Sequence, residues 1–103
     1  MIVCKFKVLK GFYEAFEISG HALYAKKGKD IVCAAVSTVS QHTARALSED
    51  GAQLEIEEGY LKVEKIPKDN ISQRFVEELR KTLEDIASQY PRYVRVEVND
   101  DAH

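Results

Sequence analysis

The alternation of apolar and polar residues at the start of the chain most constrains what it can fold into. Between Met1 and Leu9 one face of the run is apolar: Ile2, Cys4, Phe6 and Val8. Lys5 and Lys7 lie on the other face, a pattern typical of a half-buried strand. Lys10-Gly11 predicts a tight turn, and Phe12 to Ile18 is expected to return as the second strand of a hairpin.

A helical period follows the hairpin. Asp30 is a favoured N-cap, because its carboxylate can accept a hydrogen bond from a first-turn amide, and Gly51 is expected to end the helix. Apolar or small residues recur between them at steps of three and four: Val32, Val36, Val39, Thr43, Ala46 and Leu47. This spacing predicts an amphipathic helix with one buried stripe. A neighbouring stripe is small and polar: Cys33, Ser37, Ser40 and Gln41.

The second half of the chain begins with another hairpin pattern. Gln53 to Glu57 and Tyr60 to Ile66 are expected to pair around the turn Glu58-Gly59. The residues expected to face inward are Leu54, Ile56, Leu61 and Val63. The hairpin is expected to end at Pro67.

A second helix and a last strand complete the pattern. Asp69 or Asn70 is expected to cap the helix, and Pro91 to stop it. Its expected core face is Ile71, Phe75, Leu79, Leu83, Ile86 and Tyr90. Tyr93 to Val98 predicts a strand, and Asn99 to His103 a frayed tail.

The predicted order is therefore ββαββαβ. It predicts an α+β fold with a mostly antiparallel or mixed sheet and two helices packed on one face. A chain of 103 residues has a common size for one domain, so residues 1–103 are expected to form a single domain. The other sheet face is expected to be partly wet or used for self-association, with Tyr13 and Tyr60 on it.

The charge of the chain argues against a nucleic-acid binder. Lys and Arg number 15 and Asp and Glu number 17, which gives a net charge of −2. A nucleic-acid-binding domain is expected to carry a basic face. Here the densest basic run, Lys26-Lys27 with Lys29, is short.

The cysteines and the N-terminus indicate the compartment. Cys4 and Cys33 do not make a disulfide framework, and Cys4 on the apolar strand face is expected to be a small core residue. Lys5 and Lys7 interrupt the N-terminal apolar run, so no signal peptide is expected, and no segment has the length to span a bilayer. The chain is therefore expected to be cytoplasmic, with both thiols reduced.

His21 and Cys33 are the candidate chemical pair. His21 follows the first hairpin, and Cys33 is the third residue of the expected first helix. A thiol nucleophile needs a base within hydrogen-bond reach. The helix dipole favours an anion in the first turn by ~0.3–1 kcal/mol, which lowers the pKa of a thiol by less than one unit. An ordinary cysteine has a pKa of about 8.5, so the dipole alone does not make the thiolate the main form at neutral pH. A cationic partner such as His21 must supply the remaining stabilisation of the thiolate. Main-chain amides of the first turn, including that of Cys33, are expected oxyanion donors.

Two neighbours of this pair have alternative roles. Asp30 would either fix the helix start or orient His21 as a triad carboxylate. Ser37, one turn on, would bond the thiolate, orient a main-chain group or bond back to the Cys33 carbonyl. A purely structural interpretation also stands, because a Cys in the first turn of an apolar helix is usually core filling.

A metal centre is not expected. One Cys with scattered His residues lacks the clustered spacing of a zinc site, and there is no glycine-rich phosphate loop. The two remaining histidines are expected to be solvated: His42 and His103.

A longer pattern contains both candidate residues. Gly20-His21-Ala22, Gly28 and the run from Asp30 to Ser37 (DIVCAAVS) resemble the signature of the ribosomal-processing cysteine proteases. The resemblance implies that His21 and Cys33 are the catalytic pair of a cysteine endopeptidase. It gives supporting roles to Asp30 and Ser37, and it assigns three residues to a substrate loop: Gly20, Ala22 and Gly28.

The same resemblance implies the biological role. These small bacterial enzymes remove the N-terminal extension of one large-subunit ribosomal protein, which supports ribosome assembly. The implied substrate segment is apolar and contains aromatic residues. The resemblance further implies a homodimer and a reaction that needs no cofactor or metal.

The sequence alone leaves two other functions open. A non-catalytic module could bind ribosomal protein or RNA through Lys26, Lys27 and Lys29, although the negative net charge disfavours RNA. A redox-sensing thiol would need a resolving cysteine, for which Cys4 is the candidate.

Overall fold

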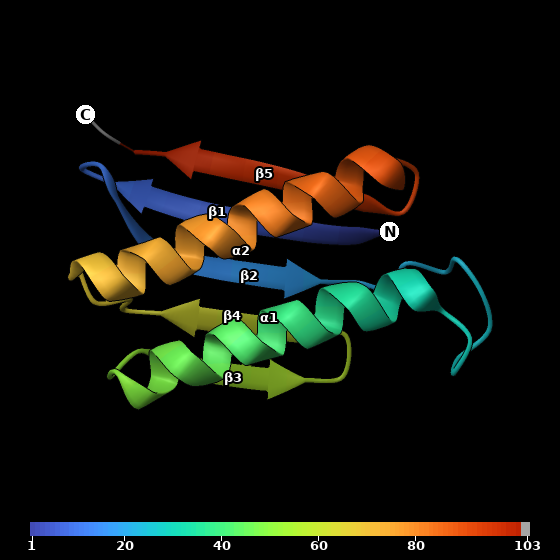
Figure 1. Cartoon of the computed structure of the whole chain (residues 1–103), viewed down its shortest axis with the longest axis horizontal. Coiled ribbons are helices and arrows are strands. Elements are labelled where there is room, and N and C mark those ends of the chain that lie inside the picture. The colour runs from blue at the N-terminus through green and yellow to red at the C-terminus, as the bar shows by residue number, and fades with distance from the viewer. Residues whose placement is uncertain (102–103) are drawn as a thin grey trace.

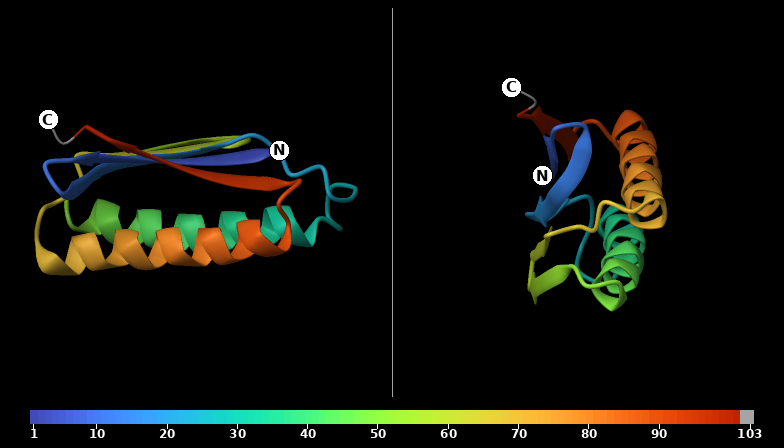
Figure 2. Two further views of the ribbon diagram at one scale, coloured as in Figure 1. Left: turned by 90° about the horizontal axis from the view of Figure 1, so that it is seen from above. Right: turned by 90° about the vertical axis from the view of Figure 1, so that its left-hand side faces the viewer.

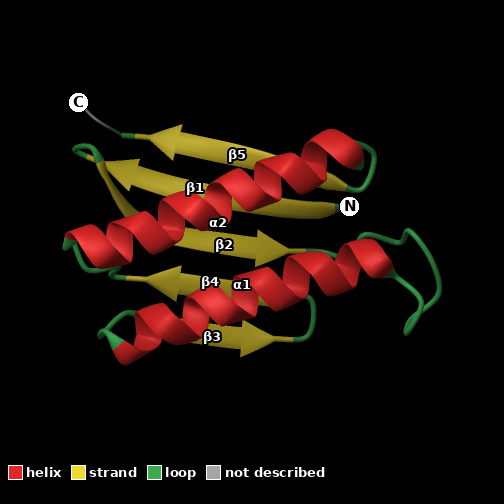
Figure 3. Cartoon of the chain, viewed as in Figure 1, coloured by secondary structure: helices red, strands yellow, loops and turns green. Residues whose placement is uncertain are grey.

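The computed structural model describes residues 1–101, which form two layers (Figure 1). The elements follow the predicted order (Figure 3): β1 (Ile2–Leu9), β2 (Phe12–Ser19), α1 (Ile31–Glu49), β3 (Gln53–Glu57), β4 (Tyr60–Glu64), α2 (Asn70–Gln89) and β5 (Val94–Asp100). The predicted order ββαββαβ is confirmed.

The strands form one mixed sheet in the order β3-β4-β2-β1-β5. β1 pairs antiparallel with β2 and parallel with β5, while β4 pairs antiparallel with both β2 and β3. Both helices cover the same face, α1 nearer β3 and β4 and α2 nearer β5 (Figure 2). The predicted α+β class, with two helices on one sheet face, is confirmed.

The core lies between the sheet and the helices. Ile2, Cys4 and Phe6 of β1 are buried there, as the alternation predicts. The helices supply the other side of the same cluster through Val32, Val36, Leu47, Val76, Leu79 and Leu83. Removal from solvent raises the pKa of the Cys4 thiol to about 12, because burial disfavours the charged form.

Tyr13 lies on the helix side of the sheet, so its expected outward position is wrong. The pairing register shifts between Lys7 and Val8, which leaves Glu14 as an extra residue on β2. The extra residue shifts the alternation, so that Tyr13, which precedes it, faces the same side of the sheet as Phe16, which follows it. Tyr13 is therefore only 9% exposed, and its hydroxyl bonds the Glu77 carboxylate.

Tyr60 faces away from the helices, as predicted. It pairs with Ser19 of β2, while its neighbour Leu61 is buried on the helix side. A hydrogen bond to the Glu17 carboxylate, together with partial desolvation and the charge of Glu17, raises the pKa of the Tyr60 phenol to about 12. The polar face of the sheet thus has its own side-chain contacts.

The expected core face of α2 is confirmed except at Ile71: Leu79 and Leu83 are buried, and Phe75, Ile86 and Tyr90 pack against the core. Its buried residues are Ser72, Val76, Leu79 and Leu83. Ile71 is 68% exposed, because the buried stripe begins one position later, at Ser72. Ile71 and Phe75 line a small apolar pocket with the neighbouring helix residues Asn70, Arg74 and Glu78.

The predicted pattern does not specify how far β3 and the polar stripe of α1 are buried. Leu54 and Ile56 pair with Val63 and Leu61, so they lie on the helix side as predicted. They are nevertheless 37% and 53% exposed, because β3 is the edge strand and has no neighbour beyond it. Ser40, placed on the polar stripe of α1, is buried.

The C-terminal strand is longer than expected. Asn99 and Asp100 pair with Lys7 and Val8 of β1, so they are not part of a frayed tail. The Asp101 amide donates to the Val8 carbonyl at 2.9 Å. The remainder of the expected tail, residues 102–103, lies outside the described residues. Neither helix of the described chain has the length and hydropathy to cross a membrane.

Candidate active site

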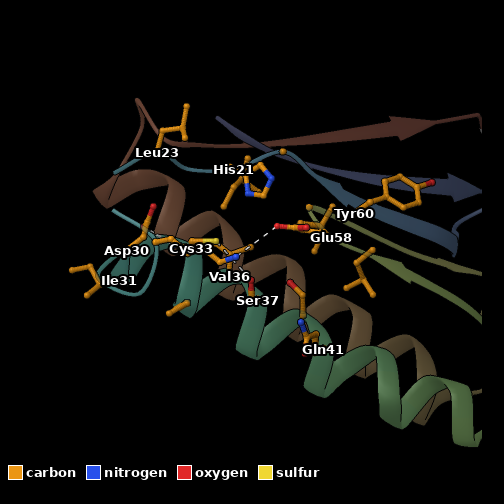
Figure 4. A pocket seen from close by; sticks show the side chains of 18 of the residues that line it. His21, Leu23, Asp30, Ile31, Cys33, Val36, Ser37, Gln41, Glu58 and Tyr60 are labelled. Carbon is orange, nitrogen blue, oxygen red and sulfur yellow. Dashed lines mark hydrogen bonds and ion pairs between the residues drawn. The ribbon is translucent and has the colours of Figure 1, made fainter. Parts of the chain in front are cut away.

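A cavity opens at the end of the molecule where four segments meet. These are the end of β2, the β3–β4 turn, the first turn of α1 and the loop of residues 20–30 (Figure 1). The cavity has a volume of about 750 Å³. His21 and Cys33 both border it (Figure 4). Its wall is largely apolar, with Ile18, Val36 and Leu61 among the lining residues.

The start of α1 places Cys33 at the cavity. Asp30 is the N-cap, with extended backbone angles of φ −84° and ψ 96°. Its Oδ1 accepts a hydrogen bond from the Cys33 amide at 2.9 Å, so Cys33 is the third helical residue, as predicted. The Cys33 Sγ lies 4.0 Å from the Ser37 Oγ, one turn on. Both side chains are half-buried.

Both oxygens of the Asp30 carboxylate accept hydrogen bonds from main-chain amides. Its Oδ2 accepts from the Tyr24 amide at 3.1 Å, in addition to the bond from Cys33. Hydrogen bonds from these amides, first of all that of Cys33, lower the pKa of Asp30. This arrangement favours a cap and loop tether over a carboxylate that orients His21. It also means that the Cys33 amide, an expected oxyanion donor, already has a partner.

His21 is held through its main chain. The Gly20 amide donates to the Gly59 carbonyl at 3.0 Å, and the Met1 nitrogen donates to the His21 carbonyl at 2.7 Å. Gly20 has φ +94°, and a side chain there would collide with the Met1 carbonyl. Only glycine fits that position, since it combines a left-handed conformation with close main-chain contact.

The loop between His21 and Cys33 contributes unequally to the cavity. Gly20 and Gly28 line it, whereas the Ala22 side chain is buried in the core and does not. Lys27 Nζ reaches across the mouth to Glu58 Oε1 at 3.9 Å, the contact drawn dashed in Figure 4. Both partners of this ion pair are exposed, so it contributes little energy.

Aromatic contacts attach the same loop to the rest of the fold. The Tyr24 ring meets those of Tyr90 and Tyr93 edge-on, with centroids 5.5 and 5.2 Å apart. Tyr90 ends α2 and Tyr93 precedes β5, so both are distant in sequence. Neither this anchor nor the β3–β4 turn was expected at the site, and the Glu58-Gly59 turn signal gave no indication of a partner.

The other candidate residues lie away from the cavity. His42 is exposed on α1, as predicted, and His103 lies outside the described residues. Cys4 is fully buried. Within residues 1–101 no group of three or more His, Cys, Asp or Glu side chains is arranged to hold a metal ion.

This chain is similar in sequence to proteins from two bacteria. A curated relative, the ribosomal processing cysteine protease Prp of Mycoplasma pneumoniae, is 81% identical over 21 residues, which span 20% of this chain and 21% of the relative. A protein of Streptococcus mutans has a crystal structure with a TM-score of 0.81 and 30% identity, over 98% of this chain and 96% of that one.

A further similar structure contains a peptide. The crystal structure of the ribosomal processing protease Prp from S. aureus, in complex with a covalently linked product peptide, has a TM-score of 0.88. Its identity is 22%, over 96% of this chain and all of the other, so it supports the fold. The sequence model of the cysteine protease Prp family matches residues 1–95. This chain therefore belongs to the cysteine protease Prp family.

Proposed function

We propose that this chain is a cysteine endopeptidase that removes the N-terminal extension of a large-subunit ribosomal protein. Cys33 is the nucleophile and His21 the general acid and base. The observation that carries the proposal is that both side chains border one cavity at the start of α1, in a chain of the Prp family. The Mycoplasma relative is named for ribosomal processing, which supports a ribosomal target.

The proposed reaction has two steps. The Cys33 thiolate attacks the scissile carbonyl carbon, and the imidazolium of His21 gives its proton to the leaving amine, which leaves a thioester and a neutral imidazole. Water then attacks the thioester while His21 takes its proton. The thiolate leaves, the carboxylic acid product loses its proton to solvent, and the starting ion pair is restored. No cofactor or metal takes part in this scheme.

The cavity fits an apolar substrate segment. Its volume of about 750 Å³ and its apolar wall suit side chains of a hydrophobic, aromatic-containing extension. Lys27 and Glu58, both exposed, form an ion pair beside the cavity. Gly20 and Gly28 give the substrate loop its turns, and Ala22 anchors the loop in the core.

Asp30 and Ser37 support the pair in this proposal. Asp30 fixes the helix start and the loop through its two amide contacts. Ser37 lies on the same helix face as Cys33 and is near enough to the sulfur to hydrogen-bond a thiolate.

The test is incubation of the folded, reduced protein with a synthetic peptide that spans the ribosomal protein's N-terminal extension and the first residues beyond it. Mass spectrometry should show one cleavage, at the boundary of the extension, that iodoacetamide treatment abolishes. A peptide with the same composition in scrambled order is the control. An intact peptide after prolonged incubation would refute the protease function.

We further propose that residues 1–103 form one catalytic domain that acts in the cytoplasm as a homodimer, without binding nucleic acid directly. The ribosomal substrate supports the compartment, and the net charge of −2 supports the absence of nucleic-acid binding. Exposed apolar residues such as Ile56 and Ile71 support self-association. Sedimentation equilibrium should give twice the mass of 11.7 kDa, and a monomer at micromolar concentration would contradict the dimer.

A further inference from the structure

We infer that Gly59, in the β3–β4 turn, is a positioning residue for the His21 imidazole. The inference rests on the proposed function, because it concerns how the proposed acid and base is held toward Cys33. Gly59 lies 38 positions from His21 in the sequence. Figure 4 shows His21 between the start of α1 and the turn that carries Glu58 and Tyr60.

Two contacts join Gly59 to the histidine. Its carbonyl oxygen accepts the amide of Gly20 at 3.0 Å, which fixes the main chain immediately before His21. The imidazole itself occupies the space that a side chain at position 59 would fill. A Cβ atom there would be 2.7 Å from His21 Nε2, 3.1 Å from Cε1 and 3.5 Å from Cδ2. The far end of the ring therefore rests on the glycine.

Packing has to orient this ring, because hydrogen bonds do not. In residues 1–101 none of the hydrogen bonds involves the His21 side chain, and the nearby carboxylate of Asp30 is occupied by the amides of Cys33 and Tyr24. A catalytic histidine is usually oriented by a third group that bonds its second nitrogen. Here the surface of the β3–β4 turn takes that orienting role.

A side chain at Gly59 would move the imidazole. A contact of 2.7 Å between carbon and nitrogen is too short to persist, and the flexible partner is the histidine ring. Rotation of the ring away from the turn changes its direction toward Cys33. Since misplacement of a catalytic group by about 1 Å can cost 10²-fold in rate, a single methyl group at this turn should be sufficient to impair turnover.

A substitution at Gly59 could act through main-chain strain at its positive φ as well as through the contact with His21, and the two effects must be distinguished. Gly59 has φ +71°, which disfavours most L-residues. Gly11, in the β1–β2 turn at the other end of the sheet, has φ +83°, and a methyl group added there would meet nothing within 4 Å. Lys10 and Lys65 show that this fold accepts side chains at positive φ. Matched substitutions at Gly11 and Gly59 therefore differ mainly in the contact with His21.

The experiment compares Gly59→Ala and Gly59→Asn with Gly11→Ala and Gly11→Asn, since asparagine tolerates positive φ best. The readouts are kcat and KM for the extension peptide and the rate at which iodoacetamide labels Cys33. Both Gly59 variants should lose about 10²-fold in kcat relative to their Gly11 partners, with KM within about threefold. Loss of the imidazole in His21→Asn should slow the labelling of Cys33 by iodoacetamide, and both Gly59 variants should slow it in the same way. Melting temperatures should fall similarly in each matched pair.

A double variant tests whether Gly59 acts through the histidine. Adding Gly59→Ala to His21→Asn should cost no further activity and no further labelling rate, because the group that glycine positions is already gone. Additive losses, or equal losses at Gly11 and Gly59, would overturn the inference. If the wild type failed to cleave the peptide, the proposed function would fall separately, and the labelling rates of the matched variants would still decide whether Gly59 controls Cys33.

Discussion

α1 and α2 each begin with an aspartate N-cap whose carboxylate binds the amide three residues on. Asp30 Oδ1 accepts from Cys33 and Asp69 Oδ1 accepts from Ser72, each at 2.9 Å. The two caps differ in their second oxygen. In α2 it accepts from the Ser72 hydroxyl at 2.9 Å, whereas in α1 it accepts from the Tyr24 amide at 3.1 Å.

The difference decides what the third helical residue can do. Ser72 is fully buried and its hydroxyl donates to the Asp69 carboxylate. The start of α2 is therefore closed, in the sense that its third residue is not accessible to a ligand. Cys33 leaves its sulfur at the cavity, with Ser37 Oγ 4.0 Å away, and the spare oxygen of Asp30 binds the loop instead. The same local cap thus serves stability in one helix and tethers a loop beside a candidate nucleophile in the other.

Cys33→Ser tests this comparison most strongly, because it gives α1 the cap sequence of α2. We expect no detectable cleavage of the extension peptide, a loss of at least about 10³-fold, since a hydroxyl is a much weaker nucleophile than a thiolate. The melting temperature should stay the same or rise. Retained cleavage would remove Cys33 from the nucleophile role, and retained biological function without cleavage would favour the non-catalytic module.

His21→Asn removes the feature that the start of α2 lacks altogether. An amide has no titrating nitrogen, so peptide cleavage should fall by ~10²–10⁴-fold, the usual contribution of general acid–base catalysis. His42→Asn, on the exposed face of α1, is the matched control and should cleave at the wild-type rate. Turnover of His21→Asn within a few-fold of the wild type would require another base.

Local patterns were sufficient to predict most of the fold. The side-chain period of two revealed the buried face of β1, and the Asp residues marked both helix starts within a residue. The bulge that turns Tyr13 inward was not predictable, because it depends on α2. Gln73 Oε1 accepts from the Tyr13 amide at 2.8 Å and Gln73 Nε2 donates to the Tyr13 carbonyl at 2.9 Å, contacts between residues 60 positions apart.

The site was predictable only where it is contiguous. His21 and Cys33 lie in one short motif, so the sequence identified both of them as candidate site residues. Gly59, Tyr90 and Tyr93 join the site from later parts of the chain, through a main-chain bond, a missing side chain and ring contacts. A glycine in a turn signals a local bend, and nothing in its spacing reveals which distant ring it accommodates.

The reactivity of three thiols should depend on whether each is exposed to the cavity. Iodoacetamide at neutral pH should label Cys33 at least about 10²-fold faster than Cys4, whose burial blocks access and raises its pKa to about 12. In a Ser72→Cys variant the new thiol at the closed cap should also label slowly, because that position is fully buried. Peptide mapping at successive times gives the three rates. Early modification of Cys4 would show that burial does not protect that thiol, and early modification of the thiol at position 72 would show that the cavity does not distinguish Cys33 from a cysteine in the first turn of another helix.

Exchange of each cap for an amide should give the smallest effects. Asp30→Asn should reduce kcat/KM only a few-fold, because asparagine also caps helices and the hydrogen bonds of the two Asp30 oxygens go to the Tyr24 and Cys33 amides. Asp69→Asn should leave cleavage unchanged and lower the melting temperature more, since both of its oxygens serve the buried Ser72.

The pH dependence of the melting temperature of the same two variants measures how much each charged cap stabilises the fold. Amide hydrogen bonds, led by those from Cys33 and Ser72, hold the pKa of Asp30 and of Asp69 below the ordinary 3.8. A lowered pKa in the folded state means that each cap stabilises the fold above about pH 4 and loses that contribution as the pH falls through the lowered value. Each Asn variant should therefore approach the wild-type melting temperature in acid and diverge from it toward neutral pH. If Asp30→Asn instead lost about 10³-fold in cleavage at neutral pH with an unchanged melting temperature, Asp30 would be a member of the catalytic group, and the two caps would differ in kind.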